Sequence, residues 1–432
     1  MLIRVAAVQL RAHDRADFTH SLQSIVAAAA RAAEGAQLVV LPEATLPAYV
    51  LGDDRIDDTA IARALDDFRN LARTARCVIV IGTAAQCQTS IRNAAMVIDA
   101  DGSVAGRSDK VFLWHFDRRW FEAGDRIAPI QTAAGKLGVL VCADGRLPTI
   151  ARALVDRGAE ILVMPTAWVT SGRNPSALEN VQADLLARVR ARENGVPFVA
   201  ANKCGSELQM VAYCGKSQII RADGEVLTIA GEHQPQTLHA DVSIAAAVPS
   251  RSSKLAAPDI PSGNGMEPIR IAIAAGELPN DIDSRLAILD DAHALAPYDE
   301  ARTADLARTL GAAAVTDEEV FDPAGLVAYR LAGYSLLVWS TKANTDWIEP
   351  IARARALELR LYVVVFDTGA KRAFAVDPDG VVVAGTFDDY CLASFTLDPR
   401  RTIETTVAPG TDVREGLERV ESIVRNREPL SS

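Results

Sequence analysis

Apolar residues in the first half of the chain follow two different periods. Short apolar runs, IRVAAVQL from residue 3, QLVVLPE from 37 and CVIVIGTA from 77, have the length and composition of buried strands. The Ala-rich stretches between them, through 27–33 and near 57–75, have the spacing of amphipathic helices. Strands and helices in alternation predict an α/β fold.

Two later stretches have the pattern of β-hairpins. AAMVIDADGSVAGRSDK, residues 94–110, contains an Asp-Gly pair, and so does SQIIRADGEVLTIAG, residues 217–231. An Asp-Gly pair supplies the backbone freedom that a tight reversal needs. Hairpins among strand–helix units predict a mixed sheet and argue against a purely parallel Rossmann sheet.

Between residues 246 and 268 the pattern changes. Pro, Ser and Gly replace the periodic apolar residues in AAVPSRSSKLAAPDIPSGNGMEP, which is the composition of a linker. We therefore predict a first domain over 1–245, a linker over 246–268 and a second module over 269–432.

The second module is similar in sequence to part of the first. LLARVRARENGVPFVAANKCG (185–205) and PIARARALELRLYVVVFDTGA (350–370) share a helix face, with Glu193 opposite Glu358, and a following apolar strand. RGAEILVMPTAW and the hairpin after it also have counterparts. Two related modules are predicted, of which the second is truncated.

Extending this comparison backwards places KLGVLVCADGRLP against TLGAAAVTDEEVFDP. Val315 or Thr316, depending on a one-residue gap, is expected in place of Cys142. IRIAIAAG from residue 269 is similar to the first strand, but no counterpart of LPEAT or of the segment around Lys110 follows. A half-module leaves an apolar sheet face uncovered, so we expect it to pack against the first domain or another subunit.

The composition limits the classes of function. With 432 residues and 49% hydrophobic content the chain can bury a large core, and its net charge of −11 argues against nucleic acid or an anionic membrane as the main partner. The start MLIRVAAVQLRAHD lacks the long apolar region of a signal peptide, and no apolar run is long enough to span a bilayer. A cytoplasmic protein with a small-molecule or protein partner is expected. Six scattered cysteines predict neither a disulfide framework nor a metal site, and no cofactor is expected.

Three side chains of different chemistry each follow an apolar strand. Glu43 comes directly after LVVLP, Lys110 ends a predicted hairpin strand, and Cys142 ends the run KLGVLV. Taken alone, they are more commonly a loop carboxylate, a surface lysine and an inert core thiol. However, loops at strand ends are where sites are commonly built, and a nucleophilic thiol needs a base and oxyanion donors. Together the three predict a nucleophilic site.

Over about residues 1–245 the chain resembles the nitrilase, or carbon–nitrogen hydrolase, superfamily. Four segments carry the resemblance, in the order of the family: LPEAT, DKVFLW, GVLVCADGRLP and RARENGVPFVAANKCG. The resemblance implies an α-β-β-α four-layer sandwich, and a truncated nitrilase-like α/β module after the linker. It also implies a Glu43–Lys110–Cys142 triad in which Glu43 deprotonates the thiol and the thiolate attacks an amide-type carbon. Lys110 and the backbone N–H of Ala143 would stabilise the oxyanion. Subunits of this family commonly pair, so a homo-oligomer, a dimer or larger, is expected.

Two departures from the family pattern refine the expected reaction. The second glutamate of many members corresponds here to Asp117, which is expected to orient Lys110, with Glu122 as the alternative. The nucleophile is followed by Ala143 and Asp144, as in amidase and carbamoylase branches, whereas true nitrilases usually read Cys-Trp-Glu. The resemblance therefore implies hydrolysis of a small amide or N-carbamoyl compound through a thioester.

Further side chains near these positions are candidates for lining a substrate pocket, although each is equally consistent with packing. The aromatic candidates are Tyr49, Trp114, His115, Phe116 and Trp168. Arg146 and Arg173 are candidates for meeting a substrate carboxylate, although surface pairing or helix capping is the commoner role.

Two other functions stay open at this point. An amine that intercepts the thioester would make the protein an acyltransferase. A nitrilase-like chain could also serve as a binding or regulatory protein without turnover. Product analysis separates the first from hydrolysis, and the reactivity of the Cys142 thiol toward an electrophile tests the second.

Overall fold

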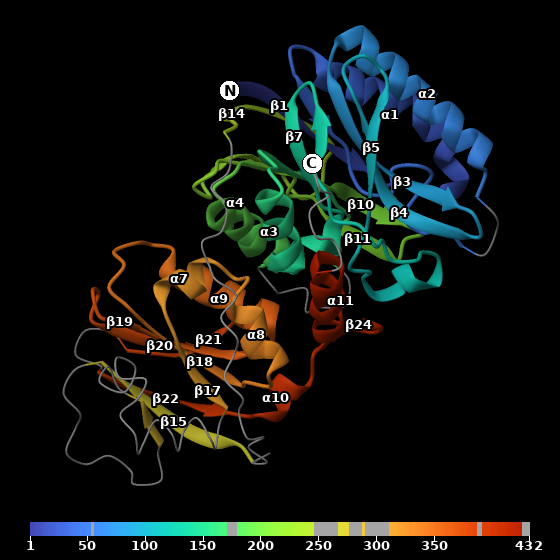
Figure 1. Cartoon of the computed structure of the whole chain (residues 1–432). Helices are drawn as coiled ribbons and strands as arrows, with labels where there is room; N and C mark the ends of the chain where they lie inside the picture. Colours follow the sequence, from blue (N-terminus) through green and yellow to red (C-terminus); the bar gives the residue numbers. More distant parts are fainter. Residues whose placement is uncertain are drawn as a thin grey trace. The chain divides into compact units, whose positions relative to one another are not determined.

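The computed structural model describes residues 1–52, 56–170, 179–245, 267–275, 287–289, 311–386 and 391–425 (Figure 1). The chain divides into two compact units. Unit 1 comprises Met1–Ser250, Ala408–Thr411 and Arg419–Ser432, and unit 2 comprises Arg251–Val407 and Asp412–Glu418. The predicted linker lies almost wholly outside the described residues. Part of the predicted second module belongs to unit 1, because the chain returns to that unit at Ala408.

Unit 1 contains an eight-stranded mixed sheet with the order β11-β10-β1-β2-β3-β4-β5, and β14 also pairs with β1. The hydrophobic periods place its first three strands correctly. The strands are β1 (Leu2–Arg11), β2 (Leu38–Val40), β3 (Val78–Cys87), β4 (Ser90–Ile98), β5 (Val104–Asp109), β10 (Lys203–Glu207), β11 (Val211–Cys214) and β14 (Gln236–Ser243).

A second sheet of unit 1 has the order β13-β12-β9-β8-β7-β6. Its strands are β6 (Ile130–Thr132), β7 (Gly135–Val139), β8 (Ile161–Pro165), β9 (Phe198–Ala201), β12 (Gln218–Ile220) and β13 (Val226–Ile229). Both predicted hairpins are confirmed, because β4 pairs with β5 and β12 with β13 in antiparallel register. Gly102 and Gly224 have φ of 84° and 85°, which explains the glycine in each turn.

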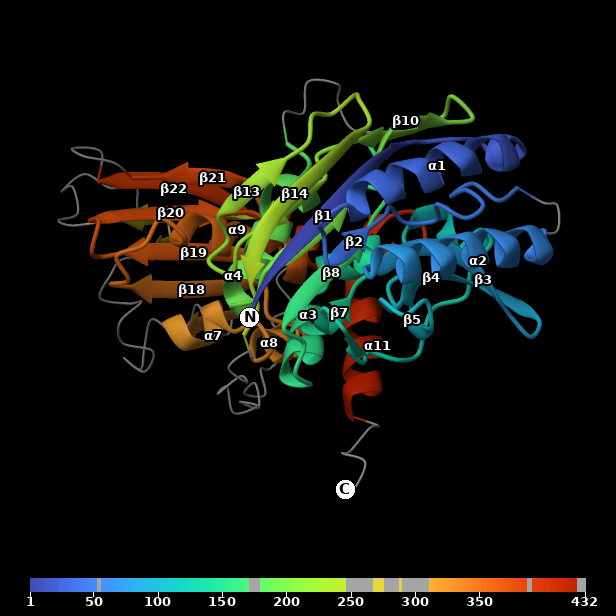
Figure 2. The same ribbon diagram turned by 90° about the horizontal axis from the view of Figure 1, so that it is seen from above.

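Helices cover the outer faces of the two sheets, which face each other. The first sheet carries α1 (Phe18–Ala33) and α2 (Asp58–Ala75), which lie side by side (Figure 2). The second carries α3 (Pro148–Asp156) and α4 (Ala187–Asn194). This is the α-β-β-α sandwich that the resemblance to the nitrilase superfamily implies.

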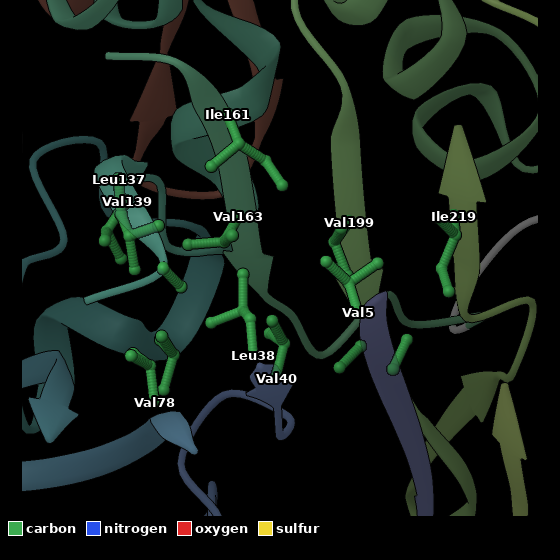
Figure 3. Close-up of a cluster of buried hydrophobic side chains, with 14 of the residues drawn as sticks. Val5, Leu38, Val40, Val78, Leu137, Val139, Ile161, Val163, Val199 and Ile219 are labelled. Atoms are coloured by element: carbon green, nitrogen blue, oxygen red, sulfur yellow. The ribbon is translucent and has the colours of Figure 1, made fainter. Parts of the chain in front are cut away.

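The core of unit 1 has two apolar layers, which explains why its strands are apolar without interruption. Val5 of β1 points toward the second sheet and lies, with side chains of β2 and β3, in one layer with side chains of β7, β8, β9 and β12 (Figure 3). Ala6 and Val8, on the opposite face of β1, pack against α1 and α2 instead. A strand that is buried on both faces carries few polar residues, so polar side chains are found mainly at its ends.

Unit 2 contains a five-stranded and a three-stranded sheet. The five strands are β17 (Ala312–Val315), β18 (Leu336–Thr341), β19 (Tyr362–Asp367), β20 (Arg372–Val376) and β21 (Val382–Gly385). The three are β16 (Ala287–Leu289), β15 (Ile269–Ala274) and β22 (Leu392–Leu397). Other elements are η1 (Arg15–Asp17), η2 (His115–Arg119) and η4 (Gln182–Leu186) before the linker and, after it, α7 (Asp317–Phe321), α8 (Leu326–Leu331), α9 (Ile348–Leu359), α10 (Arg400–Ile403), β23 (Thr406–Ala408), β24 (Thr411–Asp412) and α11 (Val413–Arg425). Across the ranges described, no helix is both long and apolar enough to span a bilayer.

The five-stranded sheet of unit 2 has the same order of parallel and antiparallel pairs as β7-β8-β9-β12-β13 of unit 1. Side-chain contacts correspond as well. Arg190 Nε of α4 donates to Gly145 O (2.9 Å), and Arg355 Nε of α9 donates to Val320 O (2.8 Å). Each arginine also pairs with a glutamate three residues on, which is the helix face that the sequence comparison found.

These contacts fix which residue of unit 2 corresponds to Cys142. Gly145 lies three residues after Cys142, and Val320 lies three residues after Asp317. The expectation of Val315 or Thr316 at this position is therefore wrong by one or two residues. The Ala-rich run before Thr316 offers no landmark from which a sequence comparison could find the gap.

Candidate active site

Glu43 lies in the loop that follows β2. Its N–H donates to Thr166 O (3.3 Å), which ties this loop to the end of β8 in the other sheet. Gly82 of β3 lies so close that a Cβ there would be 2.4 Å from the Glu43 Cα. Glu43 Oε1 accepts hydrogen bonds from Asn93 Nδ2 (2.6 Å) and Lys110 Nζ (2.7 Å), whereas Oε2 is buried and has no partner among the described residues. An unpartnered carboxylate oxygen is an acceptor available for proton transfer.

Lys110 follows β5 and is held between two carboxylates. Its Nζ lies 2.7 Å from Glu43 Oε1 and 2.7 Å from Asp117 Oδ2, and all three side chains are fully buried. Burial lowers the pKa of Lys110, but the charges of Asp117 and Glu43 raise it, and the net result is well above the usual value. The side chain is therefore an ammonium that supplies positive charge and hydrogen bonds, and it is not a base.

Asp117, and not Glu122, contacts Lys110. Asp117 Oδ1 also accepts a hydrogen bond from the Tyr49 hydroxyl (2.8 Å). The Glu122 side chain is 65% exposed and pairs with Arg92 at 3.4 Å. Of the two carboxylates that the sequence left open, only Asp117 therefore lies within reach of the lysine.

Cys142 begins the 3-10 turn η3 (Cys142–Arg146) just after β7, with a left-handed φ of 47°. The residue is 4% exposed. Burial and the charge of Glu43 raise the pKa of the Cys142 thiol to about 12, although the Lys110 ammonium pulls in the opposite direction. The thiol is therefore protonated at neutral pH, and its attack on a substrate needs a base.

The Asp144 carboxylate joins the turn of the thiol to the segment after Lys110. Its Oδ2 accepts from Val141 N–H (3.0 Å), and its Oδ1 accepts from the N–H groups of Val111 (3.0 Å) and Phe112 (2.8 Å). Burial raises the pKa of Asp144 to about 7, although these hydrogen bonds lower it. Sequence comparison used this residue only to choose a branch of the family, whereas here it sets the spacing between thiol and ammonium.

The predicted pocket residues have different placements. Tyr49 is part of the buried network, because its hydroxyl binds Asp117. Trp168 is 1% exposed, its N–H donates to Asn202 Oδ1 (2.9 Å), and its Nε1 has no partner in the described part of the chain. Ala143 is buried next to the thiol.

The other candidates lie around the aromatic segment. Trp114 is partly buried, and the guanidinium of Arg146 lies 4.6 Å from its ring centroid, which is a cation–π contact. The rings of His115 and Phe116 are 4.9 Å apart in an edge-on arrangement. Arg173 lies outside the described residues.

Sequence reasoning missed a second buried ion pair behind the Glu43 loop. Lys203 Nζ lies 2.7 Å from Glu207 Oε1 and donates to Ala44 O (3.1 Å). Glu207 Oε2 accepts from the N–H groups of Tyr49 (3.0 Å) and Val50 (2.8 Å). A usable signal exists, since opposite charges at an even spacing in a strand point to the same face.

The chemistry available here is nucleophilic. A thiol, a carboxylate with an open oxygen and a fixed ammonium are the parts needed for attack on a carbonyl carbon. Within the described ranges, no group of three His, Cys, Asp or Glu side chains could hold a metal ion.

Comparison with known proteins gives a consistent picture. The family model for carbon–nitrogen hydrolases matches residues 4–251. A probable nitrilase from Schizosaccharomyces pombe is 29% identical over 262 residues, which cover 59% of this chain and 93% of the relative. An (R)-stereoselective amidase from Pseudomonas sp. is 27% identical over 234 residues, 54% of this chain and 82% of the relative.

Solved structures of an amidase from Nesterenkonia sp. are similar in fold. One is 29% identical with a TM-score of 0.50 and covers 55% of this chain and 89% of that one. A Glu-to-Gln mutant of that amidase, 28% identical with a TM-score of 0.50 and with the same two coverages, shows covalent addition of the acetamide moiety of fluoroacetamide at its active-site cysteine.

Proposed function

The chain belongs to the carbon–nitrogen hydrolase family, and from this premise we propose that it hydrolyses small amides or N-carbamoyl compounds through a thioester on Cys142. The observation that carries the proposal is the buried network of Asp117, Lys110 and Glu43, in which the charges of Glu43 and Lys110 act on the thiol. Lys110 has two anionic partners and stays charged, so the base is Glu43, through its unpartnered Oε2.

Acylation begins when Glu43 takes the proton of the Cys142 thiol as the sulfur attacks the carbonyl carbon. The Lys110 ammonium and the backbone N–H of Ala143 donate to the oxygen that becomes negative. Glu43 then returns the proton to the nitrogen, the carbon–nitrogen bond breaks, and ammonia or an amine leaves. The acyl group stays on sulfur as a thioester.

Deacylation uses the same groups. Glu43 takes a proton from a water molecule, the resulting hydroxide attacks the thioester carbon, and the proton returns to the sulfur as the acid leaves. An amine in place of water would give acyl transfer by the same steps. Hydrolysis is the leading proposal because the family model is that of hydrolases.

An amide-type substrate is favoured over a nitrile by the residues after the thiol and by two of the similar proteins. Asp144 follows Cys142 at the spacing of amidase and carbamoylase branches. The Pseudomonas relative and the Nesterenkonia structures are amidases, although the Schizosaccharomyces relative is named a probable nitrilase. A panel of small amides, N-carbamoyl compounds and nitriles distinguishes these substrate classes.

The direct test is ammonia release by the wild type and by Cys142→Ala. We expect turnover by the first and none by the second, with both chains folded by circular dichroism. Turnover by Cys142→Ala would refute the assignment. A wild type that turns over no member of the panel, and whose Cys142 reacts with fluoroacetamide no faster than the other cysteines, would favour a binding or regulatory role.

We also propose that residues 1–245 form the catalytic domain and that the module after the linker is a non-catalytic copy. Asp317 corresponds to Cys142, and its carboxylate accepts a hydrogen bond from Trp339 Nε1 (2.7 Å). Asp317→Asn should leave turnover unchanged, and a large loss would contradict this.

We further propose that the enzyme is cytoplasmic and forms a homo-oligomer. All six cysteines are free, which is typical of proteins from a reducing compartment. Light scattering on the full chain decides the oligomeric state, and a monomer would contradict it.

A further inference from the structure

The segment from Lys110 to Gly124, here the Lys110 loop, carries Asp117 and closes on itself. Trp114 N–H donates to Asp117 Oδ2 (2.8 Å) near its start, and Gly124 N–H donates to Lys110 O (2.7 Å) at its end. Two residues from the far end of the chain bind this loop. They are Thr411 and Arg419, which belong to unit 1 together with the loop.

Thr411 binds the loop next to the residue that orients Asp117. The Thr411 side chain is fully buried, and its Oγ1 accepts a hydrogen bond from His115 N–H (2.6 Å) and donates to Leu113 O (3.5 Å). His115 has a left-handed φ of 47°, which a non-glycine residue adopts only when its surroundings hold it there. Thr411 therefore holds the strained residue beside Trp114, whose N–H binds the Asp117 carboxylate.

Arg419 binds the other end of the loop. Its Nη2 donates to Gly124 O (2.7 Å) and to Ala123 O (3.2 Å). Gly124 is the residue whose N–H closes the loop onto Lys110, and it cannot be bulkier, because a Cβ there would lie 2.6 Å from Asp109 O. Arg419 thus binds the carbonyl of the same residue whose N–H is hydrogen-bonded to the backbone of Lys110.

We propose that Thr411 and Arg419 are positioning residues of the active site, which hold Asp117 and Lys110 in register with the thiol. The inference rests on the proposed function, but its residues lie beyond the stretch that the family model covers. A displacement of about 1 Å at a reacting group costs about 10²-fold in rate. Two anchors that hold a loop of this length can therefore act on turnover without touching substrate.

The first experiment compares matched variants of the full chain. Thr411→Val keeps the shape and removes the hydroxyl, Thr411→Ser keeps the hydroxyl, and Arg419→Met removes the guanidinium. We expect kcat to fall about tenfold or more in Thr411→Val and Arg419→Met with KM changed less than about threefold, and Thr411→Ser to retain most of the activity. Arg425→Met is the control, since Arg425 lies on the same helix and pairs with Glu421.

Two readouts separate positioning from a merely structural role. A displaced Asp117 would withdraw its charge from Lys110, so the alkaline limb of kcat/KM should move to lower pH in Thr411→Val and Arg419→Met but not in Arg425→Met. Combined with Asp117→Asn, either change should add little, because both act through the same carboxylate. Losses that simply multiply in the double variants, with an unmoved alkaline limb, would overturn the proposal.

Hydrogen exchange keeps the inference separable from the proposed function. Amides of residues 111–124 should exchange faster in Thr411→Val and Arg419→Met than in the wild type, whether or not an amide substrate is turned over. Unchanged exchange in this segment would refute the anchoring itself. Faster exchange in these two variants, together with a wild type that shows no hydrolase activity, would leave the anchoring in place and refute only the catalytic role.

Discussion

Glu43 and Lys110 share a hydrogen bond of 2.7 Å although neither side chain is exposed to solvent. A buried charge is costly unless it is paired and hydrogen-bonded, and Lys110 meets this condition twice, because Asp117 lies on its other side. Two carboxylates share one ammonium, so the cluster retains a negative charge. Burial, and after it the charge of Glu43, raises the pKa of the Cys142 thiol against the effect of Lys110, and so disfavours a resting thiolate.

Three strained backbone positions lie at or near the same site. Ala44, His115 and Cys142 all have a left-handed φ, between 44° and 47°. Each such residue costs about 1–3 kcal/mol and persists only where the surroundings hold it. All three lie at or next to a member of the buried network, so the fold gives up stability there to aim the side chains.

Replacing Asp117 tests the second carboxylate. Asp117→Asn keeps the size of the side chain and removes its charge, so Lys110 loses part of its stabilisation and is held less firmly. We expect kcat to fall about 10- to 100-fold, less than when an oxyanion donor is removed outright, and the alkaline limb of kcat/KM to move to lower pH. Steady-state kinetics from pH 6 to 10 measure both. Glu122→Gln is the matched control, because that exposed side chain pairs only with Arg92 among the contacts described; a larger loss there would reverse the assignment.

Replacing Gly82 tests the position of the base without changing any titratable group. A Cβ at Gly82 would lie 2.4 Å from Glu43 Cα, Ala44 N and Pro42 O, so backbone must move. We expect Gly82→Ala to cost about 1–3 kcal/mol of stability and at least about 10-fold in kcat. Gly231→Ala is the control, since no atom lies within 4 Å of its added Cβ. Equal kinetics in the two variants would mean that the Glu43 loop tolerates the shift.

The sequence predicts most of unit 1 because its elements repeat a local pattern. Strands such as β1 are apolar throughout, helices have one apolar face, and the Asp-Gly turns give the hairpins. Glu43, Lys110 and Cys142 stand at strand ends, where the topology of the sheets brings them together. Their positions are therefore readable without knowledge of the loops.

What the sequence could not predict depends on contacts between distant segments. Nothing local marks Thr411 or Asn93 as neighbours of the site, because each reaches it from another part of the chain. The choice between Asp117 and Glu122 depended on which way two side chains of one loop point. For these residues, register and loop geometry carry the information, and a residue pattern does not.

The buried Lys203–Glu207 pair should stabilise the Glu43 loop. Lys203→Met leaves the Glu207 carboxylate buried without its cation, and we expect a loss of about 3–5 kcal/mol in the free energy of unfolding. Chemical denaturation measures it. Arg221→Met is the control, because Arg221 pairs with Asp223 at the surface and should leave stability nearly unchanged. Equal effects of the two changes would show that the buried pair contributes no more than a surface pair.

The pH dependence of stability should reveal Asp144. Burial raises the pKa of this carboxyl from 3.8 to about 7 in the folded chain, so the folded state holds a proton that the unfolded state releases. Its contribution is present below about pH 4 and is lost as pH rises to about 7. Compared with Asp144→Asn, which cannot titrate, the wild type should therefore lose up to about 4 kcal/mol between pH 4 and 7 and no more above it. Denaturation of both chains across this range measures the difference. A constant difference would exclude the shifted pKa. A wild type that instead gains stability relative to Asp144→Asn as pH rises would mean that the hydrogen bonds from Val111, Phe112 and Val141 favour the charged form more than burial opposes it.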